Sequence, residues 1–377
     1  MEIYLILKLL WWLLLGVLLM GLAIMMGTDM GVGTVLRWVG RTDTERRVAL
    51  NIIGPHWDGN QVWFILGGGA VFAAWPLVYA TAFSGLYVVM LLLLWSMIIR
   101  PLGFEYRSKL TSRAWRNAWD WTLFVSGAVP MLVFGAAFGN LFQGLPFHFE
   151  WNLTSWYVGS FLSLFNPFAI FCGLLAVALS VFMGCAMLMI RGEGDLYRRA
   201  RMIGWVAGLV AVALFAIGGA WVSGMTGYHL VSAPPFGEPQ TPLQQSVEVL
   251  QGAWLETFWS YPVSFLLPLL GVCAILGGTA ALCVRRPALA WALGALGWVG
   301  VIGTAGLALF PFLMPSSEIP SQSLTVWNSG SSERTLAWML GFTLIFIPLI
   351  VWYTSWAFHV MRGTVRNEQV EGDEHAY

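Results

Sequence analysis

The residues LLWWLLLGVLLMGLAIMM, which form Leu9–Met26, contain no charged side chain. An α-helix rises about 1.5 Å per residue and needs roughly 20 mostly apolar residues to cross the hydrocarbon core of a bilayer. The apolar run is too long for the core of a secretory signal, and no A-x-A-like cleavage site follows it. The stretch therefore predicts a first transmembrane helix that the mature protein retains.

The composition of the whole chain favours the same environment. Of the 377 residues, 58% are apolar and 10% are charged, and the mean hydropathy is +0.73. A soluble domain carries about 25% charged residues, so a soluble protein of this size could not cover its surface with so few. The 19 basic and 19 acidic side chains balance and form no basic block, which argues against nucleic acid as a partner. We expect an all-α polytopic membrane protein.

The length rule predicts about nine transmembrane helices. The second is the weakest, because Gln61 and the triplet Gly67-Gly68-Gly69 dilute its apolar character. Without it the chain would have eight spans and a different orientation. The nine predicted spans are Ile6–Gly27, Gly59–Trp75, Ala82–Ile99, Asp120–Phe142, Phe161–Ile190, Ile203–Met225, Trp259–Val284, Ala288–Met314 and Leu336–Met361.

The basic residues are distributed unevenly between the two ends of these spans. All of them except Lys8 and Arg334 follow the first, third, fifth, seventh or ninth predicted span. The positive-inside rule then predicts an N-terminus outside and a C-terminus in the cytoplasm. A count of eight would scatter this pattern, which favours nine.

Asp58 lies in His56-Trp57-Asp58-Gly59-Asn60-Gln61-Val62-Trp63, where the chain re-enters the membrane. One interpretation is structural, because Pro55 suits the first turn of a helix and an acid there complements the helix N-terminus. The other interpretation is a carboxylate that admits protons to a hydrated path. Ionisable groups within membrane segments are costly and usually functional.

Two further acids have similar alternatives. Asp29 lies among glycines after the first span and is expected either to pair with a basic residue such as Arg100 or to relay protons, and the two roles are compatible. Asp120 begins the predicted fourth span, so N-capping and pairing with Arg116 are expected there. Thr42 and Glu45 have capping-box spacing, which predicts a short surface helix from about Asp43 to Gly54-Pro55.

The histidines and cysteines indicate what this chain does not carry. A haem held between two histidines in the bilayer core would need histidines in mid-span, and none is there. We therefore expect no haem or metal ligated by this chain, and we expect the cysteines to be small buried apolar groups. No P-loop, H-E-x-x-H or C-x-x-C motif occurs. The residues concerned are His56, His148, His229, His359 and His375, and Cys172, Cys185, Cys273 and Cys283.

Four stretches together resemble subunit II of cytochrome bd-type quinol oxidases. The likeness covers essentially the whole chain, and the set of motifs in this order is highly specific. The stretches are Gly54-Pro55-His56-Trp57-Asp58-Gly59-Asn60-Gln61-Val62-Trp63, Phe72-Ala73-Ala74-Trp75-Pro76, Arg100-Pro101-Leu102-Gly103-Phe104-Glu105-Tyr106-Arg107-Ser108-Lys109 and Phe310 to Ser317.

The resemblance implies two four-helix bundles plus one helix in a single membrane domain over residues 1–377. We place the first bundle at about 1–145, the second bundle with the final helix at about 146–362 and a polar tail at 363–377. It further implies a bacterial cytoplasmic (inner) membrane, a partner subunit I that carries haems b558, b595 and d, and a complex that oxidises quinol and reduces oxygen to water. A small single-span subunit and a structural quinone are further expectations.

The resemblance also assigns roles to particular residues. The acid that matches Asp58 is proposed to lie on a proton path. Asp29, Arg100 and Asp120 match residues that are associated with the integrity of the haem region. From its own sequence context, Asp29 is also a second candidate for proton uptake, and we add His56, Trp57 and Trp63 as candidates for support of the haem region or for the subunit interface. The chain departs from the family pattern at Met26, where an acid often stands.

A secondary transporter is the alternative from another class. Transporters often place a substrate site at the bilayer midplane on broken helices, and Gly67-Gly68-Gly69 could form such a break. No charge lies near the triplet, so glycine-mediated helix packing is the simpler interpretation.

Overall fold

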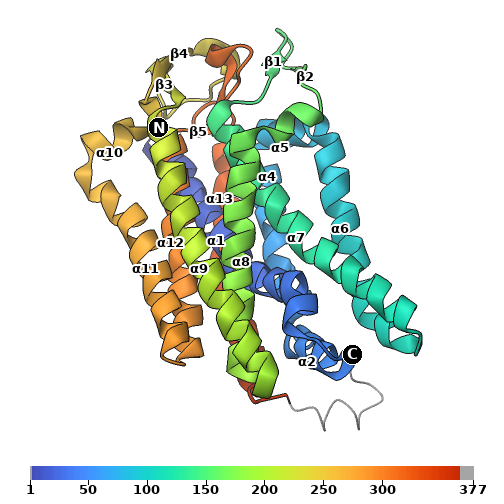
Figure 1. Cartoon of the computed structure of the whole chain (residues 1–377). Coiled ribbons are helices and arrows are strands. Elements are labelled where there is room, and N and C mark those ends of the chain that lie inside the picture. The colour runs from blue at the N-terminus through green and yellow to red at the C-terminus, as the bar shows by residue number, and fades with distance from the viewer. Residues whose placement is uncertain (1, 366–377) are drawn as a thin grey trace.

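The computed structural model describes residues 2–365, and in this part of the chain long helices lie side by side (Figure 1). Eight helices are long and apolar enough to cross a membrane, and one bent helix pair raises the number to nine if it is counted as a span. The all-α prediction is confirmed. Of the predicted tail at 363–377, residues 366–377 lie outside the part of the chain that the structure describes.

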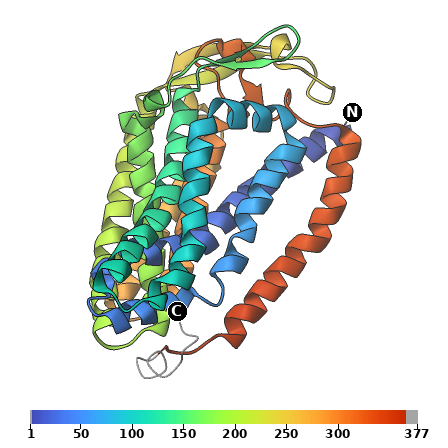
Figure 2. The same cartoon turned by 90° about the vertical axis from the view of Figure 1, so that its right-hand side faces the viewer.

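Helix α1 (Glu2–Val39) is longer than the predicted Ile6–Gly27, because the helix continues through Asp29 and its neighbouring glycines. It packs against α4, α7, α8, α12 and α13, and Figure 2 shows it inclined to its neighbours. A side chain at Gly31 would collide with the backbone carbonyl of Ser180 in α8. Only glycine permits this close approach of two helices, which draws the Asp29 region of α1 into the centre of the protein.

The remaining long helices follow the predicted spans with changed boundaries. The fourth span begins seven residues before Asp120, and the fifth begins at Pro167 because Asn166 caps its N-terminus through Ala169 N at 2.7 Å. The eighth ends at Leu309, and its expected last residues form a short strand instead. The helices are α6 (Tyr87–Tyr106), α7 (Arg113–Gln143), α8 (Pro167–Arg191), α9 (Gly194–Ser223), α11 (Leu266–Cys283), α12 (Pro287–Leu309) and α13 (Glu333–Val360).

The predicted second span, Gly59–Trp75, is the first arm of the bent pair. Helices α3 (Trp57–Asn60) and α4 (Val62–Ala74) run up to Trp75, and α5 (Pro76–Gly85) then departs at 117°. A residue before proline is disfavoured in helical geometry, and Trp75 has φ −134° and ψ 72°. Helix α5 lies across the end of the bundle (Figure 2), so the third span begins at Tyr87 and the prediction of Ala82 was wrong.

The glycine triplet lies inside α4 without a break in the helix. A side-chain carbon added at Gly67, Gly68 or Gly69 would meet no atom within 4 Å. Within the described residues the triplet therefore neither interrupts the helix nor brings another helix close, and both predictions for it were wrong.

Short antiparallel strand pairs cover one end of the helices, here called the hairpin end (Figure 1). The N-terminus lies at this end. The short helix α2 (Asp43–Ile53) lies at the opposite end, here called the α2 end. The hairpin end contains β1 (Phe147–Phe149) with β2 (Ser155–Tyr157), β3 (Thr226–Ser232) with β4 (Ser246–Gln251), β5 (Phe312–Met314) with β6 (Leu324–Thr325), and helix α10 (Glu256–Ser260).

Lys8 joins α1 to the loops of the hairpin end. Its side chain is fully buried, and Nζ donates to the carbonyl oxygens of Trp327 at 2.9 Å, Phe236 at 3.2 Å and Glu238 at 3.3 Å. Carbonyl dipoles therefore stabilise this buried ammonium group. Tyr4 Oη reinforces the contact by donating to Ser331 O at 2.8 Å.

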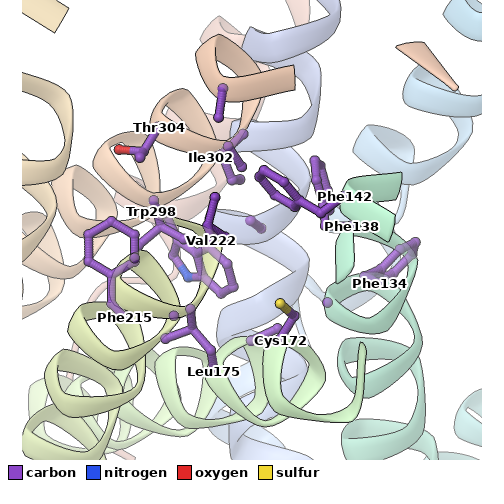
Figure 3. A pocket seen from close by; sticks show the side chains of 18 of the residues that line it. Phe134, Phe138, Phe142, Cys172, Leu175, Phe215, Val222, Trp298, Ile302 and Thr304 are labelled. Carbon is purple, nitrogen blue, oxygen red and sulfur yellow. The ribbon is translucent and has the colours of Figure 1, made fainter. Parts of the chain in front are cut away.

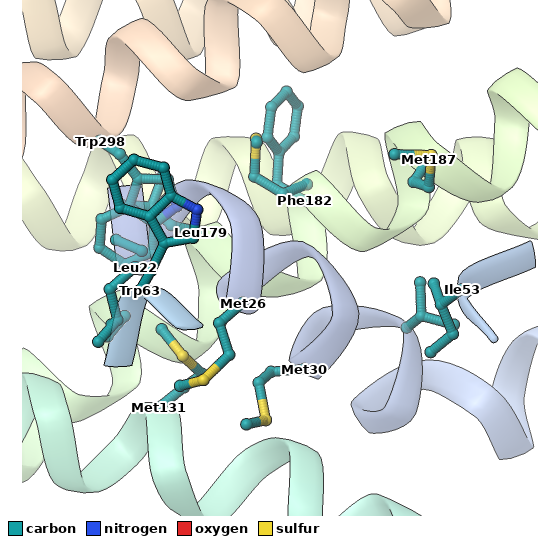
Figure 4. Close-up of a cluster of buried hydrophobic side chains, with 14 of the residues drawn as sticks. Leu22, Met26, Met30, Ile53, Trp63, Met131, Leu179, Phe182, Met187 and Trp298 are labelled. Carbon is teal, nitrogen blue, oxygen red and sulfur yellow. The ribbon is translucent and has the colours of Figure 1, made fainter. Parts of the chain in front are cut away.

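The main apolar core lies where α1 crosses α7 and α8. Figure 4 shows the side chains of Met26, Met30 and Met131 close together there. Met26 is fully buried in this core. Met26 stands where members of the family often have an acid, and its thioether side chain fits the apolar surroundings.

The cysteine prediction is only partly correct. Cys185 is buried and Cys172 is half-buried, but Cys273 and Cys283 are exposed. These last two lie on faces of α11 that point away from its neighbours within this chain. All four cysteines are free thiols.

Candidate functional site: two buried polar clusters at the α2 end

Helix α2 begins with the predicted capping box. Thr42 Oγ1 accepts from Glu45 N at 3.2 Å, and Glu45 Oε2 accepts from Thr42 N at 3.1 Å and from Arg41 N at 2.7 Å. Gly54 ends the helix, and the chain turns through Pro55 and His56 into α3. This turn delivers the segment from His56 to Asn60 to the side of α1, where Asp29 is buried.

Asp29, His56, Asn60 and Arg100 form what we call the Asp29 cluster. Asp29 is 1% exposed, and its Oδ2 accepts from Asn60 Nδ2 at 2.8 Å. His56 Nδ1 lies 3.3 Å from Asn60 Nδ2 and 3.7 Å from Asp29 Oδ1. The amide of Asn60 thus joins the carboxylate of one helix to the imidazole of the next segment.

Arg100 enters the cluster from α6 but forms no salt bridge with Asp29. No guanidinium nitrogen lies within 4.0 Å of a carboxylate oxygen of Asp29. Instead, Arg100 Nη1 lies 3.3 Å from Met30 Sδ, and the guanidinium carbon is 5.1 Å from the centre of the Trp57 ring. The predicted direct pair is therefore wrong, although both Asp29 and Asp58 act electrostatically on Arg100.

Asp58 differs from Asp29 in its surroundings. Its side chain is exposed on α3, and it has no hydrogen bond or ion pair with any of the described residues. Neighbouring Trp57 is buried and stacks on Phe104 with 5.1 Å between ring centres. The exposed Asp58 of α3 and the buried Asp29 of α1 therefore both interact electrostatically with Arg100.

His56 faces the last turns of α13. Its ring stacks on Phe358 with 4.3 Å between ring centres. Burial, together with the positive charge of Arg191, lowers the pKa of His56 to about 4. The ring is therefore neutral at pH 7. Trp63, the remaining predicted residue, packs on Gly21 of α1 within the apolar core and lies outside the cluster (Figure 4).

Asp43, Arg46, Arg107, Arg116 and Asp120 form a second group, the Asp120 cluster. Asp120 is fully buried, and its two oxygens accept from Arg46 Nη1 at 2.6 Å and Arg107 Nε at 2.7 Å. Arg107 Nη2 also donates to Asp43 Oδ1 at 2.9 Å. The cluster binds α2, the turn after α6 and α7 to one another.

The prediction for Asp120 was wrong in both respects. Helix α7 begins at Arg113 after Ser112, so Asp120 lies two turns inside the helix and does not cap it. Arg116 donates to Asp43 Oδ2 at 2.6 Å and not to Asp120. Sequence reasoning also missed Arg46, Arg107 and Asn60. The signal for Asn60 and Arg107 is their position within the motifs His56–Trp63 and Arg100–Lys109, whereas Arg46 lies in neither motif.

An apolar cavity of about 170 Å³ lies between α1, α7, α8, α9 and α12. Figure 3 shows Phe134, Phe138, Phe142, Phe215 and Trp298 around it. Thr304 contributes one of the few polar atoms of the lining. Among residues 2–365, no group of three or more His, Cys, Asp or Glu side chains is placed to hold a metal ion.

The fold and the two clusters define a polytopic helical membrane protein in which both buried groups of carboxylates and arginines lie at the α2 end. Comparison with known proteins identifies the family. The model of cytochrome bd terminal oxidase subunit II matches residues 7–361, and the chain belongs to this family.

Related chains have the same length. Cytochrome bd-I ubiquinol oxidase subunit 2 of Escherichia coli (strain K12) is 45% identical over 99% of both chains. Cytochrome bd ubiquinol oxidase subunit 2 of Bacillus subtilis is 31% identical over 96% of this chain and 97% of that one. The solved bd oxidase from Geobacillus thermodenitrificans has a chain with the same fold, with a TM-score of 0.64 at 9% identity, covering 95% of this chain and 99% of that chain.

Family membership settles the choice between the two classes of function. The chain is a subunit of a respiratory oxidase of the bacterial membrane, and the alternative of a secondary transporter is wrong. The unbroken α4 agrees with this, because the alternative depended on a break at the glycine triplet.

Proposed function

We propose that this chain supports the haem-bearing subunit I of a ubiquinol:oxygen oxidoreductase and carries protons toward it from the cytoplasm. The proton route begins at Asp58 and reaches Asp29 past Arg100. The observation that carries this proposal is the contrast between the two acids, one exposed and one buried, in the field of a single buried arginine. The electrogenic step in this chain is the uptake of protons from one side of the membrane.

The orientation belongs to the same proposal. Nearly all basic residues lie at the α2 end, which supports a cytoplasmic location of that end and an outer location of the N-terminus. Asp58 then faces the side from which protons are taken. The division into two bundles at about residue 145, and a small single-span subunit in the complex, remain parts of the proposal.

Haems b558, b595 and d are assigned to subunit I, and this chain would ligate none of them. The apolar cavity fits the isoprenoid tail of a structural quinone, because its lining is aromatic and aliphatic over almost its whole surface. Phe134, Phe138 and Phe215 would hold the tail by apolar contact, and the hydroxyl of Thr304 is a polar group that a quinone carbonyl could meet. A quinone bound there would fill the cavity and pack against both α1 and α12.

In the proposed proton path, this chain supplies carboxylates and a fixed positive charge. The Asp58 carboxylate takes a proton from water at the surface, and Arg100 keeps the local potential positive so that an ionised acid is stabilised beside it. Asp29 is shielded from the aqueous phase by α3 and by the His56–Phe358 stack. Water that bypasses Asp58 is thereby excluded from Asp29.

Asp58→Asn in the purified complex tests the proton path. We expect quinol oxidation to slow by about tenfold or more, since a neutral amide cannot carry a proton, while the reduced haem spectrum stays unchanged. Asp195→Asn is the matched control, because Asp195 is an exposed acid of α9 with a side chain 67% exposed. Wild-type turnover in Asp58→Asn would overturn the proposed path.

A further inference from the structure

The Asp29 cluster contains five buried polar atoms without a hydrogen-bond partner, one of which is His56 Nε2. Of the other four, two are donors, the Nε and Nη2 groups of Arg100, and two are acceptors, Asp29 Oδ1 and Asn60 Oδ1. All three side chains are at least 97% buried, with exposed fractions of 3%, 1% and 2%. Buried polar atoms are almost always hydrogen-bonded, since each one left unpaired costs about 1–3 kcal/mol, and more when it is charged.

The unpaired atoms of Arg100, Asp29 and Asn60 complement one another as donors and acceptors. Arg100 offers two N–H groups, whereas Asp29 and Asn60 offer one free oxygen each. A water molecule accepts two hydrogen bonds and donates two. One water molecule can therefore bond to two guanidinium donors and two oxygen acceptors at once. These four atoms form no hydrogen bonds with one another.

The positions of the three side chains are consistent with such a bridge. Asn60 and Asp29 are in direct contact at 2.8 Å. Arg100 touches Met30, the residue next to Asp29, and lies beside Trp57, which is one helical turn before Asn60. No guanidinium nitrogen of Arg100 lies within 4.0 Å of a carboxylate oxygen of Asp29, although the two charges interact electrostatically.

We propose that Arg100, Asp29 and Asn60 form a water-binding site and that an ordered water molecule joins Arg100 to Asp29. Asn60 is its positioning residue. Its Nδ2 is committed to Asp29 Oδ2, so its Oδ1 faces the remaining space as an acceptor. The two N–H groups of Arg100 take the lone pairs of the water, and both of its hydrogens then point toward Asp29 and Asn60.

This orientation has a chemical consequence, which rests on the proposed function. When the O–H bond of a protonated Asp58 carboxyl breaks, one N–H group of Arg100 withdraws from the water and the released lone pair forms the new O–H bond. The O–H bond of the water that points to Asp29 Oδ1 then breaks as that oxygen takes the proton. The water is regenerated, and Asp29 gains the proton. Arg100 keeps its own protons throughout, because a guanidinium group is not deprotonated in proteins.

The complex of this chain with its partner subunit provides a direct test. A structure at a resolution that shows ordered waters should contain density within hydrogen-bond distance of Asp29 Oδ1, Asn60 Oδ1 and Arg100. An empty site, or a direct Arg100–Asp29 salt bridge in the complex, would overturn the proposal. If the water density is present but Asp58→Asn has full activity, the water site stands and proton entry through Asp58 is rejected. Failure of this inference and failure of the proposed function therefore give different results.

Two variants of Asn60 add a functional readout. Asn60→Ala leaves room for a second water, whereas Asn60→Leu fills the space with an apolar group of similar size. We expect Asn60→Leu to lower turnover about tenfold, equivalent to about 1.4 kcal/mol in the barrier, with a larger solvent isotope effect. The loss of turnover in Asn60→Ala should be clearly smaller than in Asn60→Leu.

An equal loss of turnover in both Asn60 variants would mean that the amide acts only through its direct hydrogen bond to Asp29, which would contradict the proposal. Asn117→Leu is the control for a polar-to-apolar change at the same end, since the exposed side chain of Asn117 in α7 bonds, among the described residues, to Arg37 alone. The reduced haem spectrum of each variant reports whether the complex has assembled normally.

Discussion

The Asp29 cluster and the Asp120 cluster lie at the same end of the protein and have the same ingredients, yet they are completed to different degrees. Each contains a buried aspartate and a buried arginine. Asp120 has an arginine on each oxygen, and Arg107 joins it to Asp43 so that only its Nη1 lacks a partner. Asp29 accepts a hydrogen bond from one amide, and the Arg100 guanidinium group donates to no oxygen among residues 2–365.

The difference separates structure from chemistry. A nearly satisfied network fixes the groups that make it, and removing one member leaves the others unpaired in a medium of low dielectric. Unsatisfied donors and acceptors mark a space where something else binds. We therefore assign the Asp120 cluster to holding α2 in place, and the Asp29 cluster to the reaction.

The largest effect is expected for Asp120→Ala. This change leaves the Arg46 and Arg107 guanidinium groups without their buried carboxylate, which costs about 3–5 kcal/mol. We expect the yield of assembled complex and its thermal midpoint to fall sharply. Asp195→Ala, at an exposed acid, should change neither. A complex of normal stability would break the comparison, since Asp120 would then not be structural.

Asp29→Asn should give the opposite result. The variant keeps the shape of the side chain and a hydrogen bond to Asn60, so the complex should assemble with a thermal midpoint near that of the wild type. Turnover should fall about 100-fold, because the amide cannot accept a proton. Paired measurements of melting and quinol oxidation on both variants test the assignment, and a stability loss as large as that of Asp120→Ala would contradict it.

The smallest effect is expected for Glu45, which ties α2 to α9 through Arg199. Burial raises the pKa of Glu45, but the hydrogen bond from Arg199 and those from the backbone of Thr42 and Arg41 outweigh it and lower the pKa overall. The stabilisation is therefore complete above the unfolded pKa of about 4.3 and is lost as the pH falls through the lower folded value.

Glu45→Gln measures that contribution. At pH 7 the variant should lose about 0.5–1 kcal/mol, as a partly exposed ion pair does, and the difference from wild type should vanish as the pH is lowered below 4. A thermal midpoint recorded against pH gives the comparison. A difference that does not depend on pH would indicate that the carboxylate charge is not what ties α2 to α9.

Much of the architecture could be predicted from the sequence because hydropathy and charge act locally. Leu9–Met26 indicates a membrane helix by composition alone, and Thr42 and Glu45 predict the start of α2 by spacing. The second span was predicted to end at Trp75, where the chain does bend, but helix α5 was missed because apolar residues continue beyond the bend and were assigned to a loop and to the third span.

The site was predicted less completely because its contacts join distant segments. Asp58, Asp29 and Arg100 stand out as charges near apolar spans, but Asn60 is neutral and attracts no notice by itself. The partner of Asp120 depends on where α7 begins. A start seven residues earlier than expected turns its carboxylate toward Arg46 and Arg107, which lie 74 and 13 residues away in the sequence.

The buried ammonium of Lys8 has a consequence for the order in which the protein matures. Its shortest hydrogen bond is to Trp327 O, 319 residues further along the chain, and the neighbouring contact of Trp11 reaches Leu336 O. During synthesis, α1 enters the membrane long before these carbonyls exist. A nascent chain halted between residues 238 and 327 already has the carbonyl groups of Phe236 and Glu238 but lacks that of Trp327, the nearest acceptor for Lys8. Helix α1 therefore completes its contacts at the hairpin end only after the loop that precedes α13 has been made.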